Sequence, residues 1–379
     1  MYNYKLEDFV TIQENKSPFD ANDMVKICKR HNNPKRDFLF VNKYQGKHFP
    51  TSYKNFDTLT YALYKAIAEK CDTKERVLII GFAETATALS MKVMIDAVDG
   101  QKINPVYYIQ TTRETIATTK EPIHFEEEHS HATSQTLYWD TSVKFDTVVM
   151  IDDEITTGNT IINLVRQIKK FKPNTRFIAA SILNWQNKAC QQKFAEEHIE
   201  TAYLIKGELK ESTPIIELSE TEPESVDAKT KINHITLMHD GPHPRCGMTA
   251  NDITKYLNHL TDIAKQYHVP NTDKILVVGT EETMFPALLF ASFFPNAVSH
   301  STTRSPIAIS TDENYFISSG AKFHSSYGDE HGIFLYDVPE NTYKYMLIVS
   351  ETWTQQFEKE ITAFAHEKGI PDIEFINIS

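Results

Sequence analysis

The sequence is poor in cysteine and glycine and has no long apolar stretch. Its 379 residues include only 4 cysteines and 12 glycines, and no two cysteines have the Cys-x-x-Cys spacing of a zinc site. Sparse, dispersed cysteines are typical of proteins in a reducing cytoplasm. No apolar run approaches the roughly 18 residues of a membrane-spanning helix, and the polar N-terminus lacks a signal core. We therefore expect a cytoplasmic protein with no membrane partner.

Positive charge is also scarce, because 39 lysines and arginines stand against 51 aspartates and glutamates, and the net charge is -12 at pH 7. A strongly acidic chain is repelled by the phosphates of nucleic acids and of anionic membranes. Together with the lack of a helix-turn-helix pattern, this argues against nucleic acid as a partner. The chain is long enough for two domains, and its 41% hydrophobic residues are enough for each domain to bury a core.

Short apolar segments alternate with longer segments of helical periodicity, and this order predicts an α/β protein with mainly parallel sheets. Strands are expected at residues 76–81, 105–112, 147–153 and 176–185, and helices at 87–98 and 159–171. Residues 207–231 are acidic and rich in Ser, Thr and Pro, which is typical of a linker. We therefore expect a first domain at 1–206 and a second α/β domain at 232–379.

The second domain echoes the first. ILVVGTEET at 275–283 parallels VLIIGFAET at 77–85, and Thr-Thr-Arg at 302–304 parallels Thr-Thr-Arg at 111–113. YMLIVSE at 345–351 matches the strand that precedes two aspartates in the first domain, but it lacks those acids. Two explanations stay open. Unrelated α/β domains share such fragments by chance, or the second domain is a duplicate that lost its acidic motif.

The stretch TVVMIDDEITTGNT at 147–160 contains the residues that indicate a binding site. A strand that runs through a glycine turn into a helix gathers backbone N–H groups at the helix N-terminus, where the helix dipole also favours a phosphate. Gly158 lets the backbone approach this phosphate without a clash. Asp152 and Asp153 would repel a phosphate alone, but sugar hydroxyls can donate to them and a divalent cation can offset their charge. The stretch thus predicts a bound ribose, a diphosphate and Mg2+.

VVMIDDEITTGNT resembles the phosphoribosyl pyrophosphate (PRPP) signature of type I phosphoribosyltransferases: four apolar residues, two acids, two variable positions, then Thr-Thr-Gly-x-Thr. The resemblance implies that fold and an Mg2+-dependent enzyme that joins the ribose 5-phosphate of PRPP to a nitrogenous base or base-like acceptor. It assigns Asp152 and Asp153 to the ribose hydroxyls and to magnesium. The 5-phosphate would be cradled by Thr156, Thr157, Gly158, Asn159 and Thr160. Glu154 stands where the family more often has an apolar residue, so it is either a surface residue or an extra charge near the metal.

The same resemblance gives roles to two segments before the signature. The loop Gly81-Phe82-Ala83-Glu84-Thr85 would contact pyrophosphate, mainly through backbone N–H groups; a plain strand–helix connection is the alternative. Glu84 departs from the family, since an acid that faces pyrophosphate must point away or be offset by magnesium. Arg113 is a candidate pyrophosphate clamp, because a guanidinium binds phosphate oxygens bidentately.

Between Arg113 and Thr136 the family has a mobile loop that closes over the reacting carbon and excludes water. We expect a loop here too, because this part of the chain has little apolar periodicity. Its Glu126 and His129 are candidates for a metal ligand or a proton-transfer group. A solvated charged loop is the alternative.

Two further segments are candidates for acceptor binding. Residues 32–50 surround an apolar strand with basic groups and would form a hood, with Lys47 and His48 towards the acceptor. The alternative is a hairpin with solvated lysines. Trp185 ends a core strand and either stacks on a flat acceptor or fills the core.

In the second domain, Thr303-Arg304-Ser305-Pro306 resembles the signature of the TRSP domain. That domain occurs behind a phosphoribosyltransferase domain in proteins of bacterial tellurite-resistance-type stress gene clusters. Thr303, Arg304 and Ser305 would form an anion-binding trio, and the alternative is a structural arginine that ties down a loop. A weaker polar cluster comprises His239, Asp240, His243 and Arg245.

Two classes of function remain. A phosphoribosyltransferase would bind PRPP and a small-molecule acceptor, whereas a regulatory protein of the same fold would bind PRPP or a nucleotide without chemistry. Type I relatives are often dimers. A homodimer is therefore one arrangement to expect, and a second domain that replaces the partner within the chain is the other.

Overall fold

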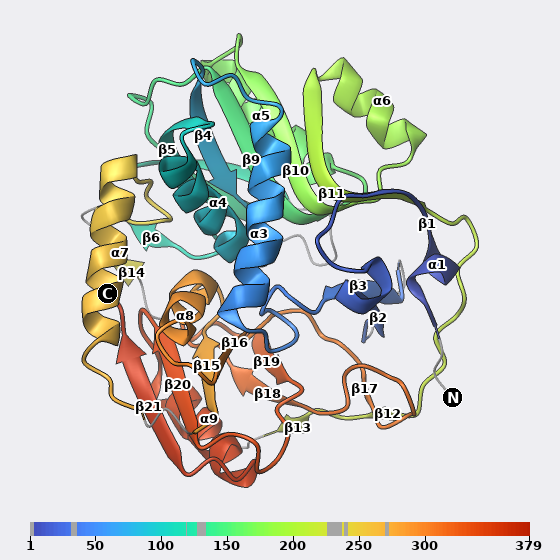
Figure 1. Cartoon of the computed structure of the whole chain (residues 1–379), viewed down its shortest axis with the longest axis vertical. Helices are drawn as coiled ribbons and strands as arrows, with labels where there is room; N and C mark the ends of the chain where they lie inside the picture. The colour runs from blue at the N-terminus through green and yellow to red at the C-terminus, as the bar shows by residue number, and fades with distance from the viewer. Residues whose placement is uncertain are drawn as a thin grey trace.

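A computed structural model of the protein describes residues 4–31, 36–118, 120–126, 134–225, 237–238, 242–269 and 273–379. Two mainly parallel sheets, one in each half of the chain, dominate it (Figure 1). This confirms the predicted α/β class. Within the described residues, no helix is both long enough and apolar enough to cross a membrane.

The first sheet has six strands in the order β1-β11-β10-β9-β4-β5, all parallel except β1 against β11. In chain order these strands are β1 (Val10–Asn15), β4 (Arg76–Gly81), β5 (Asn104–Gln110), β9 (Thr147–Ile155), β10 (Arg176–Asn184) and β11 (Ile199–Leu209). The sequence predicts β4, β5, β9 and β10, whose apolar runs are typical of strands covered on both faces. It does not predict the more polar β1 and β11.

Helices cover both faces of this sheet. One face carries α3 (Tyr53–Ala68) and α4 (Thr87–Gly100), and the other carries α5 (Asn159–Phe171) and α6 (Lys188–Glu196). α5 buries Ile161, Leu164 and Ile168, the i, i+3, i+7 spacing of an amphipathic helix. Because α5 begins four residues after β9 ends, its N-terminus lies at the carboxyl edge of the sheet.

An antiparallel ribbon of β2 (Val25–Lys29) and β3 (Phe38–Asn42) follows the short helices α1 (Leu6–Phe9) and α2 (Ala21–Met24). We call this ribbon the hood. The sequence predicts only its second strand. A backbone bridge between Arg30 and Ile307 joins the hood to the second half of the chain.

A hairpin of β7 (Glu121–Glu126) and β8 (Ser134–Trp139) packs against α5. The expected loop before Thr136 is therefore wrong for residues 121–126 and 134–136, which pair as strands. Ile123 and Phe125 are buried between exposed neighbours, a period-two pattern that indicates a strand despite the surrounding charge. His129 lies outside the described residues.

The second sheet has four parallel strands in the order β16-β15-β20-β21. They are β15 (Ile275–Gly279), β16 (Ala297–Ser301), β20 (Tyr345–Ser350) and β21 (Asp372–Asn377). One face packs on α7 (Ala250–Ala264) and α8 (Met284–Ala291). The other packs on α9 (Gln355–Glu367) and the hairpin of β18 (Gly320–His324) and β19 (Gly332–Tyr336).

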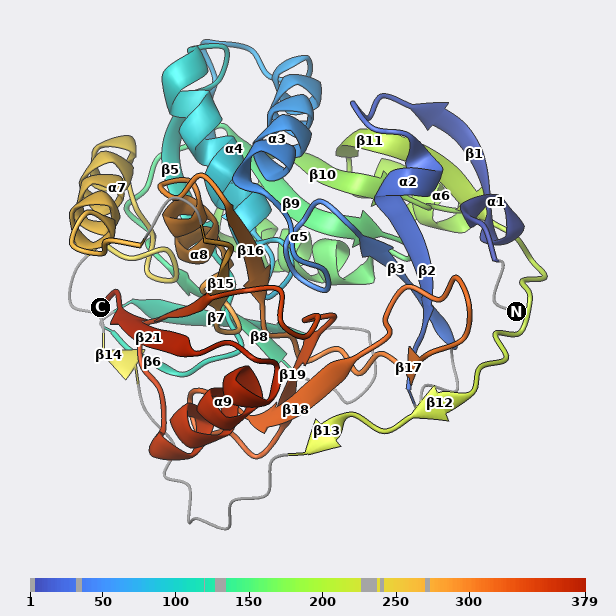
Figure 2. The same ribbon diagram turned by 60° about the horizontal axis from the view of Figure 1, so that its bottom comes forward.

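The two halves share a hydrophobic core. α4 packs against α8, and buried residues of α3, α4, α7 and α8 form one cluster (Figure 2). Short pairings add to this: β6 (Ile116–Ala117) with β14 (Leu237–Met238), β12 (Glu220–Thr221) with β17 (Ile309–Ser310), and β13 (Glu224–Ser225) with β18. Two of these strands lie in the expected linker. As a result, the carboxyl ends of the two sheets face one another.

Leu164→Ala is expected to lower the free energy of unfolding by about 2–5 kcal/mol, because it empties fully buried space between α5 and the first sheet. Urea unfolding followed by circular dichroism measures the change. The control Lys170→Ala, at an exposed position of the same helix, should change it by less than about 0.5 kcal/mol. Equal losses in both variants would contradict the packing of α5.

Candidate active site

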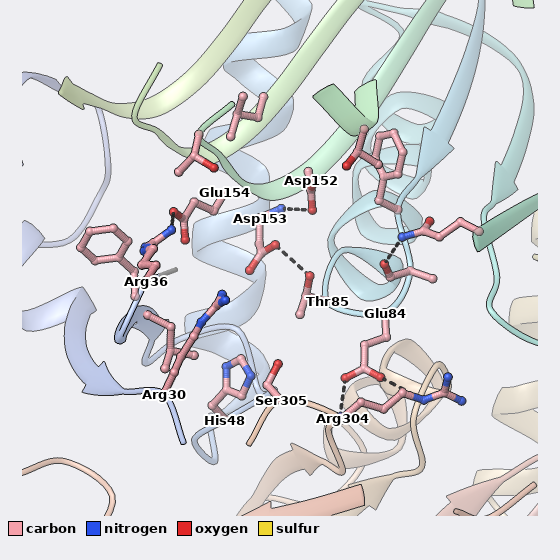
Figure 3. Close-up of a pocket in the computed structure, with 18 of the residues that line it drawn as sticks. Arg30, Arg36, His48, Glu84, Thr85, Asp152, Asp153, Glu154, Arg304 and Ser305 are labelled. Atoms are coloured by element: carbon pink, nitrogen blue, oxygen red, sulfur yellow. Dashed lines mark hydrogen bonds and ion pairs between the residues drawn. The ribbon is translucent and has the colours of Figure 1, made fainter. Parts of the chain in front are cut away.

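A cavity of about 460 Å3 lies at the carboxyl ends of β9 and β4, the edge where parallel sheets bind ligands. The first half of the chain supplies the strand ends, the turns after them and part of the hood. The second half supplies Arg304, Ser305, Pro306, His331 and Gly332. Figure 3 shows side chains from both halves turned towards this space.

The turn between β9 and α5 lines the cavity. Its lining residues are Thr156, Thr157, Gly158 and Thr160. Gly158 has a φ of +67°, in the left-handed region that favours glycine, and a Cβ there would lie 2.3 Å from a ring carbon of Phe194. The Thr157 carbonyl accepts a hydrogen bond from Cys190 Sγ at 2.9 Å. The turn is thus fixed at a helix N-terminus, where unpaired N–H groups favour an anion.

The paired acids Asp152 and Asp153 line the same cavity. Asp152 Oδ1 accepts the Asp153 N–H at 2.9 Å, and Asp153 Oδ1 accepts the Thr85 hydroxyl at 2.8 Å (Figure 3). Burial raises the pKa of Asp153, and its side-chain interactions with Asp152 and Thr85 oppose this shift. Such a carboxylate favours a ligand that donates to it or offsets its charge. Glu154, by contrast, pairs with Arg36 of the hood at 2.9 Å.

The loop after β4 runs along the cavity with Phe82, Ala83, Glu84 and Thr85. The Phe82 N–H donates to the Ile151 carbonyl at 3.0 Å, and the Ala83 N–H donates to the Thr111 hydroxyl at 2.9 Å. Gln135 Nε2 donates to the Ala83 carbonyl at 3.0 Å, and the Ala83–Glu84 peptide bond is cis. The loop is therefore anchored to β9, β5 and β8.

The Glu84 carboxylate is turned towards the second half of the chain. It accepts the Thr303 hydroxyl at 2.9 Å and the Arg304 N–H at 3.1 Å, and it pairs with the buried Lys47 ammonium at 3.0 Å. The guanidinium groups of Arg113 and Arg304 lie 3.6 and 3.8 Å from its second oxygen. Burial raises the pKa of Glu84, but the three cations outweigh burial and lower the pKa to about 2. The charge of Glu84 is thus compensated before any ligand arrives.

Comparison with known families agrees with this geometry. Residues 24–208 match the profile of a family described as phosphoribosyl transferase, and residues 243–364 match the TRSP domain that lies C-terminal to it. The chain carries a phosphoribosyltransferase domain followed by a TRSP domain. This assigns the protein to the phosphoribosyltransferase class of enzymes. No curated protein matches the chain in a sequence comparison.

Solved structures of adenine phosphoribosyltransferases resemble about half of the chain. They include the Trypanosoma brucei enzyme with AMP, pyrophosphate and ribose-5-phosphate, the Saccharomyces cerevisiae enzyme with adenine and an imino-altritol bisphosphate, and the Giardia lamblia enzyme with 9-deazaadenine. Their identities are 15%, 8% and 11%, each with a TM-score of 0.33 over 48% of this chain and 76%, 94% and 95% of the other.

Two of the three candidate acceptor residues do not reach the cavity of the phosphoribosyltransferase domain. Lys47 is fully buried and donates to the carbonyls of Glu281 and Thr302 at 3.0 and 2.7 Å, so it braces loops. Trp185 is 1% exposed and packs on Phe40 in the core. The prediction that Lys47 and Trp185 contact an acceptor in this cavity is therefore wrong. The third candidate, His48, lines the cavity, and burial followed by the Lys47 charge lowers its pKa to about 3, so it is neutral.

Three other candidates are not among the residues that line the cavity. Glu126 is exposed at the end of β7, where its carbonyl accepts from Asn163 at 3.3 Å. The Asn159 side chain accepts from Lys193 of α6 at 3.2 Å. Gly81 ends β4, and a Cβ there would lie 1.8 Å from a side-chain oxygen of α4. Its role in the structure is therefore close packing.

Residues of the TRSP signature bind carboxylate side chains of the protein. The Thr303 hydroxyl donates to Glu84, and the Arg304 guanidinium donates to Glu281 at 2.6 Å, to Asp329 at 3.3 Å and to Glu114. Ser305 lines the cavity. Thr303 and Arg304 therefore bind acidic side chains of the protein, and not the anion that the sequence predicted. This corresponds to the structural arginine that the sequence left as the alternative.

The cavity also contains residues that the sequence did not single out. They are Arg30, His31, Gln135 and His331. Arg30 and His31 follow β2, just before the segment considered as a hood, and the basic run Lys29-Arg30-His31 was the available signal. Gln135 lies in the hairpin expected to be a loop. His331 comes from the TRSP domain, and nothing local connects it with a site in the other half.

The site has a place for magnesium only together with a ligand. Among the described residues, no group of three or more His, Cys, Asp or Glu side chains is arranged to hold a metal ion. Asp152 and Asp153 offer carboxylate oxygens on the cavity wall, and Mg2+ is commonly bound by one or two carboxylates plus substrate phosphates. The residues therefore fit an ion that is shared with a diphosphate.

Glu84→Gln is expected to lower the free energy of unfolding by about 3 kcal/mol at neutral pH, because it leaves buried cations undercompensated. The folded pKa of about 2 lies below the ordinary value of 4.5, so the carboxylate stabilises the fold above the unfolded pKa. The deficit of the variant should be constant above about pH 6 and shrink as the pH falls from about 4.5 towards 3. Urea titrations across this range measure it.

The control is Glu217→Gln, at an exposed position, which should stay within about 0.5 kcal/mol of the wild type at every pH. A Glu84→Gln deficit that does not depend on pH would contradict an ionised, charge-paired Glu84.

Proposed function

We propose that the protein is an Mg2+-dependent phosphoribosyltransferase that transfers ribose 5-phosphate from PRPP to a nitrogenous base or base-like acceptor and releases pyrophosphate. The observation that carries the proposal is one cavity lined by both the paired acids, Asp152 and Asp153, and four residues of the glycine turn, Thr156, Thr157, Gly158 and Thr160. An anion-binding turn beside two carboxylates suits a phosphorylated sugar, which has a phosphate at one end and hydroxyl donors at the other.

The two acids would hold the ribose through its hydroxyls, because ionised carboxylates only accept hydrogen bonds. The turn would hold the 5-phosphate through N–H groups that carry the positive end of the α5 dipole. The hydroxyls of Thr156, Thr157 and Thr160 add donors on the same wall. This division keeps the phosphate away from the acids.

The pyrophosphate of PRPP would lie along the loop at 82–85, with Arg113 as its clamp. Arg113 lines the cavity, and a guanidinium binds phosphate oxygens in a bidentate manner. Glu84 does not oppose this, because its carboxylate also serves Lys47, Thr303 and the Arg304 N–H. When bound, Mg2+ on Asp152 and Asp153 would offset the charge of the leaving group.

The acceptor would lie under the hood. Leu39 and Phe40 give this part of the cavity an apolar lining, and Arg30 and the neutral His48 add polar groups. A flat nitrogenous ring suits such a mixed lining. The volume of about 460 Å3 is sufficient for small-molecule ligands.

In the reaction, the bond between C1 of the ribose and pyrophosphate breaks, and pyrophosphate leaves with the bonding pair. The acceptor nitrogen forms the new bond to C1 and loses its proton to pyrophosphate or water. C1 gains oxocarbenium-like charge, which Asp152 and Asp153 stabilise, while Arg113 stabilises the departing anion. The remaining contribution is the placement of both reactants. We expect no covalent enzyme intermediate.

The double variant Asp152→Asn, Asp153→Asn should lose at least about 100-fold in turnover while the fold survives, because amides of the same shape carry no negative charge. Pyrophosphate release is measured with PRPP, Mg2+ and a panel of nucleobases and base-like amides. The control Asp146→Asn, an exposed acid just before β9 that pairs with Arg76, should keep wild-type turnover.

Unchanged turnover in the double variant would remove the two acids from the site. Tight PRPP binding by the wild type with no pyrophosphate release for any acceptor would instead support the regulatory alternative.

The remaining expectations belong to the same proposal. A cytoplasmic location agrees with four free cysteines, and the net charge of -12 disfavours nucleic acid as a partner. The domain limits at 1–206 and 232–379 stay predictions. A role in a bacterial tellurite-resistance-type stress response rests on the TRSP resemblance alone and also stays a prediction.

A further inference from the structure

The two halves of the chain are built around equivalent strands. β4 ends at Gly81 and β15 ends at Gly279, and a glutamate follows three residues later in each, Glu84 and Glu282. Each strand lies between two parallel neighbours: β5 and β9 in the first half, β16 and β20 in the second. In the first half, the β7/β8 hairpin covers the same face of the sheet as α5, the helix that follows β9. In the second half, the β18/β19 hairpin likewise covers the same face as α9, the helix that follows β20.

The loops after the two glycines are held by matching hydrogen bonds. The Ala83 N–H donates to the Thr111 hydroxyl at 2.9 Å, and the Glu281 N–H donates to the Thr302 hydroxyl at 2.8 Å. The backbone bonds that tie each loop to its neighbouring strands, β9 and β5 or β20 and β16, also correspond. The same loop geometry therefore occurs twice.

Each loop glutamate binds the Thr-Arg pair of the other half. Glu84 accepts from the pair at 303–304, at 2.9 Å from the hydroxyl and 3.1 Å from the arginine N–H. Glu282 accepts from the pair at 112–113, at 2.7 Å from the hydroxyl and 3.0 Å from the arginine N–H. The contact from the first half to the second is thus mirrored by one in the opposite direction.

A backbone pairing shows the same reciprocity. Thr51, two residues before α3, exchanges two N–H···O bonds with Ser299 of β16 at 2.9 and 2.8 Å. Met248, two residues before α7, exchanges two such bonds with Tyr108 of β5, both at 2.8 Å. Contacts in which i meets j and the equivalent j meets i are the property of a two-fold interface between like subunits.

We propose that the TRSP domain is a second copy of the phosphoribosyltransferase domain that serves as its built-in partner subunit, and that Glu282 positions Arg113 for pyrophosphate. The positioning role rests on the proposed function. The second copy has lost its own site. β20 ends at Ser350, and Ser350-Glu351 stands where β9 has two aspartates. Glu351 is bound to Arg245 and, at 3.0 Å, to His243.

The arginines of the two pairs both line the cavity and have different acidic partners. Arg304 of the TRSP domain donates to the carboxylates of Glu281 and Asp329 and also to Glu114, so its guanidinium is committed to protein acids. Arg113 also lies on the cavity wall, its guanidinium is 3.6 Å from the Glu84 carboxylate, and its backbone N–H is held by Glu282. Glu282 is in turn fixed by the fully buried Arg245 at 2.7 Å. The TRSP domain therefore reaches the pyrophosphate region through a rigid chain of charge-assisted bonds.

Calorimetry with two probes tests this positioning in the full-length protein. Inorganic pyrophosphate with Mg2+ reports on Arg113, and ribose 5-phosphate reports on the acids and the glycine turn. Glu282→Gln should raise the Kd for pyrophosphate about tenfold, because it removes charge-assisted hydrogen bonds behind Arg113. The Kd for ribose 5-phosphate should change less than about twofold, since Glu282 does not contact that turn. Wild-type protein should bind one ribose 5-phosphate per chain.

Two further variants separate positioning from general damage. Thr112→Val removes the hydroxyl that Glu282 accepts and should give the same selective loss. Glu360→Gln is the matched control, because Glu360 is a buried TRSP carboxylate whose partners His324 and Gln356 belong to its own domain. It should leave both affinities unchanged. Thermal unfolding establishes that each variant is folded.

Three results would overturn the inference. Equal weakening of both probes in Glu282→Gln would assign the residue to general stability, and unchanged pyrophosphate affinity would remove it from positioning. Two ribose 5-phosphate sites per chain would contradict the loss of the second site. If wild-type protein binds neither probe, the proposed function itself fails, a result distinct from the other three.

Discussion

The buried charge of Glu84 is the constraint on which the site depends. An ionised carboxylate that is removed from water costs several kcal/mol unless cations and donors surround it. Lys47 comes from the segment after the hood, Arg113 from the end of β5, and Thr303 and Arg304 from the TRSP domain. The loop at 82–85, the segment after the hood and the TRSP domain must therefore be in place together, and the geometry of the cavity depends on both halves of the chain.

The same arrangement explains how an acidic protein can offer a phosphate site. The acids that line the cavity have different surroundings: Glu84 is compensated across the domain boundary, Glu154 is paired with Arg36, and Asp152 and Asp153 are the acids that we propose hold the ribose. In the proposed function, the phosphate groups would bind to backbone N–H groups and to Arg113. The net charge of -12 thus opposes nucleic acids as partners without weakening the local attraction for a small phosphorylated ligand.

Local pattern predicted the part of the site that is contiguous in the chain. Strand, acid pair, glycine turn and helix follow one another within 147–171, and the structure has β9 and α5 with those limits or close to them. Residues whose surroundings come from elsewhere were less predictable. Trp185 and Lys47 proved buried, because packing and charge partners from distant segments decide exposure. The hairpin of β7 and β8 was taken for a loop, because its short alternation is hidden among charges.

The sequence alone determined the α/β class, the glycine turn at a helix N-terminus and the paired acids before it, because strand periodicity, glycine geometry and adjacent carboxylates act over a few residues. It also marked Glu84 as an unusual acid in the loop after β4, which the family resemblance assigns to pyrophosphate. Only the tertiary structure decided what that acid does, since its partner Thr303 is 219 residues away. Long-range ion pairing depends on how two sheets are packed, and no local pattern encodes which distant cation will meet a given carboxylate.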